Sequence, residues 1–72
     1  MDTNVVLEIA RRTLLDSTLT SESRLENAAG YDSLTHLQFV IELEKQSGRK
    51  LTGDLAETAT LQEVAELISA GA

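Results

Sequence analysis

The chain has 72 residues, a length that allows one domain with a small hydrophobic core. Twelve acidic residues against six basic ones give a net charge of −6, which disfavours binding to nucleic acid or an anionic membrane and favours partners with positive patches. Cysteine is absent, so the fold contains neither a disulfide nor a thiolate-bound metal, in keeping with a reducing cytoplasm. We therefore expect residues 1–72 to form a single acidic domain.

The first segment reads as an amphipathic helix from about Asn4 to Leu15. Proline is absent from the chain, and valine, isoleucine and leucine recur at helical rather than alternating spacing. The expected apolar face comprises Val6, Ile9, Ala10 and Leu14, with Val5 also a candidate for the aliphatic core. The chain starts without a basic segment, and Glu8 interrupts the first apolar run, so the sequence predicts no signal peptide or transmembrane segment and a cytoplasmic location. We expect a freestanding protein, with a domain excised from a longer chain as the alternative.

Residues 16–31 are rich in serine, threonine, asparagine and glycine. A connection of this length is unusual in a compact domain. Leu19 and Leu25 are isolated apolar residues within it, and a free linker would not need them. We expect these two leucines to attach the loop to the core, with room for a short turn of helix within the loop.

The second helix is predicted to begin at Asp32 or Ser33 and to run to about Gln46, with Gly48 just beyond its end. Its apolar residues are Leu34, Leu37, Phe39, Val40, Ile41 and Leu43. They wrap most of the helix instead of forming one stripe. This distribution indicates either deep burial or a second apolar contact.

A short helical turn is expected around Asp54 to Thr58, after a polar turn. The last helix should start at Thr60, where Thr60 and Glu63 have the spacing of a capping box. Its apolar face comprises Leu61, Val64, Ala65 and Ile68. The predicted fold is all-α, a bundle of three main helices plus one short helix, and a monomer.

Few residues are suited to catalysis or metal binding. His36 is the only histidine and cysteine is absent, which leaves little for a nucleophile–base pair. The acidic residues are scattered along the predicted helices, and neither a calcium-binding loop nor a glycine-rich phosphate loop is present. We expect neither a metal site nor independent enzyme activity.

The segment Gly30-Tyr31-Asp32-Ser33-Leu34 is the exception. Ser33 is predicted to stand at the positive end of the second helix, where unpaired backbone N–H groups favour negative charge. A phosphodiester on the serine oxygen would suit this place, and Asp32 would help a modifying enzyme to hold Mg²⁺ and phosphate. Both residues are also common helix caps, which would stabilise the chain by roughly 1 kcal/mol without any further function.

This segment and the residues that follow it, 35–44, resemble the acyl carrier and peptidyl carrier protein family. The resemblance covers essentially the whole chain: an amphipathic first helix, a long loop, Asp-Ser-Leu opening the second helix, a polar turn, a short third helix and a capped fourth. It implies that Ser33 receives 4′-phosphopantetheine from coenzyme A by the action of a separate phosphopantetheinyl transferase. The chain would then hold acyl or aminoacyl groups as thioesters and would be a substrate rather than a catalyst.

The resemblance also implies roles for the neighbours of Ser33. Asp32 and Leu34 match the residues that flank the modified serine. The positions expected to face partner enzymes, which would load, transfer or condense acyl groups, are Leu34, Leu37, Gln38, Ile41, Glu42 and Glu44. Phe39, Val40 and Leu43 match core positions.

Two features separate the chain from typical fatty-acid carriers. Gln38 and Lys45 stand among the acids of the second helix, and Tyr31 precedes Asp32 as in carriers of polyketide or nonribosomal peptide pathways. This favours specialised metabolism. His36 is expected to be exposed near the arm, with a contact to phosphate or partner as the alternative. A different class of function is also consistent with the sequence: a small acidic adaptor that binds a partner through the second helix, with Ser33 unmodified.

Overall fold

The computed structural model describes residues 2–51 and 55–70, without the side chain of Ala70. The described residues form three α-helices, α1 (Thr3–Thr13), α2 (Ser33–Ser47) and α3 (Leu61–Ala70), and one 3₁₀ turn, η1 (Leu25–Asn27). They contain no strand; a single isolated antiparallel bridge pairs Arg24 with Thr60. The predicted all-α class with three main helices is confirmed.

The short helix expected from Asp54 to Thr58 is not formed where the structure describes it. Residues 55–58 are non-helical, with a turn at 57–58, and Asp54 lies outside the described residues. Two carbonyls at the end of this segment bond to the long loop: Glu26 N–H donates to Glu57 O (2.9 Å), and Leu25 N–H donates to the O of the next residue but one, Ala59 (3.1 Å). The short helical turn lies in the loop itself, as η1, where the sequence allowed for one.

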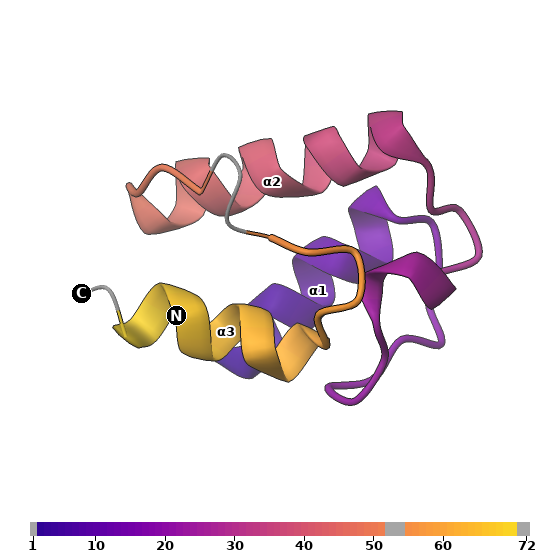
Figure 1. Ribbon diagram of the computed structural model, residues 1–72, viewed down its shortest axis with the longest axis horizontal. Helices are drawn as coiled ribbons and strands as arrows, with labels where there is room; N and C mark the ends of the chain where they lie inside the picture. Colours follow the sequence, from indigo (N-terminus) through magenta and orange to yellow (C-terminus); the bar gives the residue numbers. More distant parts are fainter. Residues whose placement is uncertain (1, 52–54, 71–72) are drawn as a thin grey trace.

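The arrangement of the helices places α1 against both other helices (Figure 1). In this view α2 and α3 lie on opposite sides of the molecule, and the segment that precedes α3 runs between them. The buried apolar residues are Val6, Ile9, Ala10, Leu14, Leu19, Leu25, Ala28, Phe39, Val40, Leu43, Leu51, Leu61, Val64, Ala65 and Ile68. Every residue predicted for the apolar face of the first helix and of the last helix is therefore buried, as expected.

Helix α1 begins at Thr3 and ends at Thr13, slightly earlier at each end than predicted. Asp2 caps it by accepting a hydrogen bond from Asn4 N–H (3.0 Å). It ends before Leu15 because Leu15 has a left-handed backbone, with φ of 55°. Val5 was expected in the core but is 37% exposed, since it lies about 100° around the helix from the buried Val6.

The long loop is attached to the core by Leu19 and Leu25, which are 3% and 0% exposed, as predicted. The Arg11 guanidinium donates two hydrogen bonds to the Leu19 carbonyl, from Nε (3.1 Å) and Nη2 (2.9 Å). The Asp16 carboxylate accepts hydrogen bonds from Thr18 N–H (2.9 Å) and Ala29 N–H (3.0 Å), and so joins the two ends of the loop. The loop is a folded part of the domain.

Acid should loosen this loop through Asp16. Hydrogen bonds from the Thr18 side chain, and from the backbone of Ala29 and Thr18, lower the pKa of Asp16. A carboxyl whose pKa is lower in the folded state contributes stability above its ordinary pKa, and this contribution disappears as pH falls through the folded value. We expect Asp16→Asn to reduce the free energy of unfolding at pH 7 and to have a much smaller effect near pH 3, measured by urea titration. Glu8→Gln, at an exposed site on α1, is the control; an Asp16→Asn effect of equal size at both pH values would contradict the prediction.

None of the helices in the described part of the chain is both long and apolar enough to cross a membrane. The described residues also bring no three His, Asp or Glu side chains together where they could hold a metal ion.

Candidate functional site

Ser33 is the first residue of α2, and Asp32 caps the helix. The Asp32 carboxylate accepts a hydrogen bond from Thr35 N–H (2.8 Å), and the Thr35 hydroxyl accepts one from Asp32 N–H (2.9 Å). This is a reciprocal capping box with threonine in the third helical position. The cap leaves the Ser33 side chain out of the network: Ser33 is exposed and, within residues 2–51 and 55–70, its hydroxyl has no hydrogen-bond partner.

Thr35 is a residue of this site that the sequence analysis did not identify. It is 7% exposed and the only polar residue among the buried ones described. Its hydroxyl donates to the Gly30 carbonyl (2.9 Å) while accepting from Asp32 N–H, so it joins the end of the loop to the start of α2. The signal was available, because threonine three residues after an aspartate N-cap has capping-box spacing.

Replacing Thr35 with valine should destabilise the domain by about 1–3 kcal/mol, because a side chain of similar shape would leave Asp32 N–H and the Gly30 carbonyl without this partner. Urea unfolding would measure the loss. Thr35→Ser keeps the hydroxyl and should lower the free energy of unfolding clearly less than Thr35→Val does. Equal losses for the two variants would show that the hydroxyl hydrogen bonds contribute nothing to stability.

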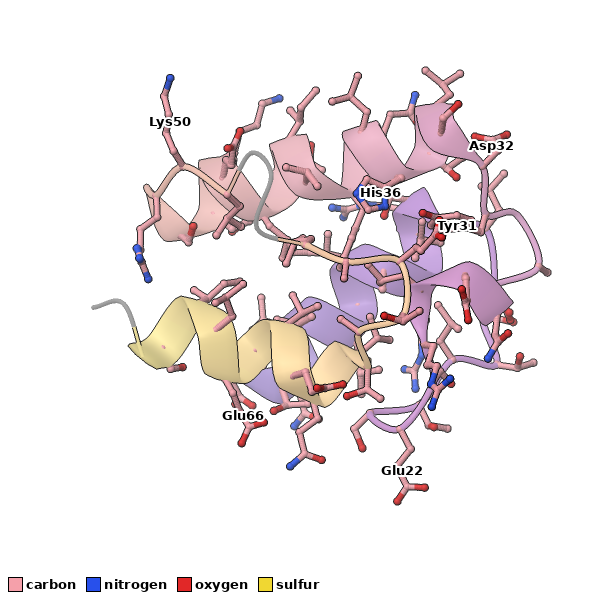
Figure 2. The ribbon with its side chains drawn as sticks, in the orientation of Figure 1. Glu22, Tyr31, Asp32, His36, Lys50 and Glu66 are labelled. Carbon is pink, nitrogen blue, oxygen red and sulfur yellow. The ribbon has the colours of Figure 1, made fainter. Side chains whose placement is uncertain are left out.

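Tyr31 and His36 form a second contact beside the cap (Figure 2). The Tyr31 hydroxyl lies 2.9 Å from His36 Nδ1, and the two rings are perpendicular with centroids 5.7 Å apart. Burial, followed by the charges of Glu57 and Glu26, raises the pKa of Tyr31, so the phenol is neutral at ordinary pH. His36 is half-buried, not exposed as expected from the sequence, and its Nδ1 is engaged within the protein.

Helix α2 has two apolar faces. Phe39, Val40 and Leu43 are buried, as predicted, at 0%, 7% and 0% exposure. The other face carries Leu34, Leu37 and Ile41, which are 62%, 54% and 41% exposed. We call these three residues the α2 stripe. Their spacing of three and four residues places them in one row that starts next to Ser33. The structure therefore explains why the helix has more apolar residues than its core face needs.

The polar residues predicted to face partners differ in their exposure and in the bonds that they already make within the protein. Gln38 is exposed. The Glu42 carboxylate pairs with Arg12 (3.3 Å) from α1 and with Lys45 (3.8 Å) one turn later. Glu44 is half-buried and accepts a hydrogen bond from Leu51 N–H (2.7 Å). Both carboxylates thus have intramolecular roles, which reduces the charge that they present to a partner.

An open groove of about 350 Å³ lies beside the α2 stripe. Its lining residues are Arg12, Thr13, Leu15, Gln38, Ile41 and Glu42. It therefore lies between the end of α1 and the middle of α2. The sequence analysis identified the α2 residues of this groove but not Arg12, Thr13 or Leu15, because the two sides come from segments that are far apart along the chain.

The predicted site residues thus fall into three groups. Ser33, Asp32 and Leu34 lie together at the start of α2, the exposed Leu37, Gln38 and Ile41 follow on the same helix, and Glu42 and Glu44 bond to neighbouring segments. Comparisons of the chain with protein-family models, with curated proteins and with solved structures found no match.

Proposed function

We propose that this protein is a phosphopantetheine-dependent carrier, modified on Ser33, that presents acyl or aminoacyl groups to partner enzymes. One observation supports it above the others: Ser33 places an exposed hydroxyl without a partner at the first position of α2, next to the exposed α2 stripe. If Ser33 were needed only as a cap, its hydroxyl would accept a backbone hydrogen bond; Asp32 does so instead.

The start of α2 fits a phosphodiester. Among the described residues, the backbone N–H groups of Ser33 and Leu34 have no hydrogen-bond partner, because the first helical bond is donated by His36 to the Asp32 carbonyl (2.9 Å). Unpaired N–H groups at a helix N-terminus attract an anion. Asp32 lies one residue before, and its carboxylate already accepts from Thr35 N–H, which keeps it in place.

In the proposed modification the Ser33 hydroxyl oxygen attacks the phosphorus of coenzyme A that carries pantetheine. The bond from this phosphorus to the oxygen of the adenosine bisphosphate breaks, the bisphosphate leaves, and the hydroxyl proton passes to a base of the transferase. When bound, the group supplies a flexible arm whose terminal thiol holds an acyl group as a thioester. The chain itself supplies the oxygen, the helix end and the surrounding surface.

The α2 stripe is suited to brief contacts with partners. Three partly exposed apolar side chains, Leu34, Leu37 and Ile41, form a small surface, and small interfaces favour weak, short-lived complexes. The proposed partners are the phosphopantetheinyl transferase and the enzymes that load, transfer or condense acyl groups. The aromatic Tyr31 before Asp32 favours a polyketide or nonribosomal peptide pathway over fatty-acid synthesis.

Intact mass tests the proposal. The purified protein is incubated with coenzyme A, Mg²⁺ and a broad-specificity phosphopantetheinyl transferase. We expect one phosphopantetheine on the natural chain and on Ser17→Ala, which removes another exposed serine, and none on Ser33→Ala. Folded protein that gains no mass with several transferases would contradict the proposal.

The exposed α2 stripe supports a second candidate, an adaptor that binds a partner protein without covalent modification. The two functions differ in their need for Ser33. An adaptor should keep its binding in Ser33→Ala and lose it in Leu37→Ala, whereas a carrier should lose its function completely in Ser33→Ala while folding almost normally.

A further inference from the structure

We infer that the groove between the end of α1 and the middle of α2 is a resting place for cargo tethered at Ser33, and that it suits an acyl group whose apolar stretch ends in a carboxylate. This inference rests on the proposed carrier function. Four features of the groove support it: its size, the exposure of Leu15, its charge and its place relative to Ser33.

The size and lining of the groove suit a small ligand. Its volume of about 350 Å³ falls in the range of small-molecule sites, and a partner helix would need a longer surface. Leu15 and Ile41 provide apolar contact area, while Arg12, Gln38 and Thr13 provide polar groups. An acyl chain with a polar end would match this combination.

Leu15 is an unusual residue to find at the surface. Its side chain is 70% exposed and its φ is 55°, in the left-handed region that residues other than glycine rarely adopt. The Leu14–Gly30 hydrogen bond, from Gly30 N–H to Leu14 O (3.0 Å), holds the backbone next to Leu15. This is the left-handed position just past a helix end, closed by the hydrogen bond from Asp16 N–H to Arg11 O (3.1 Å). Here the consequence is that a large apolar side chain lines the groove and faces solvent.

The charge feature of the groove is a cation whose carboxylate partner is shared. The charged lining residues are Arg12 and Glu42, which pair with each other, and Lys45, outside the lining, pairs with the same carboxylate of Glu42. The Arg12 side chain is 64% exposed, and only its Nη2 atom is bonded to Glu42. The remaining N–H groups of its planar fork are available to a second carboxylate.

The groove lies within reach of Ser33. Ile41 follows Ser33 by eight residues on the same helix, a distance of about 12 Å at 1.5 Å per residue. The arm has roughly 14 bonds between the serine oxygen and the sulfur, which span roughly 15 Å at the advance per bond of an extended peptide chain. Leu34 and Leu37 are exposed between the two points, so the path along α2 is apolar.

Tethering explains how an open groove could be occupied at all. A shallow site binds a free small ligand weakly, but a flexible tether gives an effective concentration in the millimolar range. Cargo on Ser33 would therefore visit the groove repeatedly and remain free to leave for an enzyme.

Two four-carbon cargos provide a matched test. Succinyl and butyryl groups are loaded onto Ser33 from their coenzyme A thioesters with the transferase, and ¹H–¹⁵N spectra are compared with those of the protein that carries the arm with a free thiol. We expect the succinyl cargo to shift the amides of Arg12, Thr13, Leu15, Gln38 and Ile41 more than the butyryl cargo does. An exposed ion pair changes an equilibrium by up to about fivefold, which sets the upper limit of the difference.

Variants separate the contribution of Arg12 from the effect of removing any exposed arginine. Arg12→Gln should abolish the difference between succinyl and butyryl, whereas Arg24→Gln, at an exposed arginine of the loop, should leave it unchanged. Arg12→Lys keeps the charge and should keep part of the difference if Arg12→Gln perturbs the fold. Spectral changes confined to residues next to Ser33, or equal for both cargos, would overturn the inference while leaving the carrier function intact. A failure to load any arm would contradict the carrier function itself.

Discussion

Phe39→Ala is expected to remove roughly 3–5 kcal/mol from the free energy of unfolding, the usual cost of deleting a fully buried aromatic side chain. Phe39 is 0% exposed and heads the fully buried side chains by volume. A stable domain has about 0.05–0.15 kcal/mol per residue, so 72 residues correspond to roughly 4–11 kcal/mol in total. The loss is therefore a large part of the whole, and much of the variant should be unfolded at 37 °C. Urea titration followed by circular dichroism measures it.

Leu37→Ala is the matched control for Phe39→Ala. Leu37 lies on the same helix two residues earlier, but it belongs to the α2 stripe and is 54% exposed. Its removal should change stability by no more than about 0.5 kcal/mol. Equal losses for the two variants would show that the division of α2 into a core face and an exposed face is wrong.

Gly30→Ala is expected to destabilise the domain by about 1–3 kcal/mol, the usual cost of overpacking. A β-carbon at Gly30 would lie 2.6 Å from the Leu14 carbonyl oxygen and 2.7 Å from the Leu15 β-carbon. The closer atom belongs to the backbone and cannot rotate away. Because the Gly30 carbonyl also accepts the Thr35 hydrogen bond (2.9 Å), any shift of Gly30 would disturb the cap in front of Ser33. Urea unfolding measures the stability, and the rate of Ser33 modification reports on the site.

Gly48 is the matched control for Gly30. It has φ of 72° after the end of α2, and a β-carbon there would meet nothing within 4 Å. Asparagine accepts a left-handed backbone with little strain, so Gly48→Asn should lower the free energy of unfolding by less than about 1 kcal/mol. Gly30→Asn should lower it clearly more. Adding Leu15→Gly to Gly30→Ala should restore only part of the loss, since the contact with Leu14 O remains. Equal effects of asparagine at the two glycines would contradict the crowding at Gly30.

The sequence by itself determined the features that depend on near neighbours along the chain. The helical spacing of Leu61, Val64 and Ile68 predicts a buried face because these side chains lie on one side of any helix. The start of α2 follows from a capping residue, and its end from Gly48, for the same local reason. The place of Ser33 at the first turn was predictable on these grounds.

Only the tertiary structure decided the features that join distant segments. Arg12 and Glu42 are 30 residues apart, and the groove that they line exists because α1 packs against α2. Glu44 reads as a solvent-facing acid in the sequence, yet it is the hydrogen-bond acceptor for Leu51 N–H. Residues 55–58 are not helical, and the carbonyls of Glu57 and Ala59 accept hydrogen bonds from Glu26 N–H and Leu25 N–H of the loop. Local rules describe separations of about four residues, whereas these contacts form only when the helices pack and the backbone groups find partners across the fold.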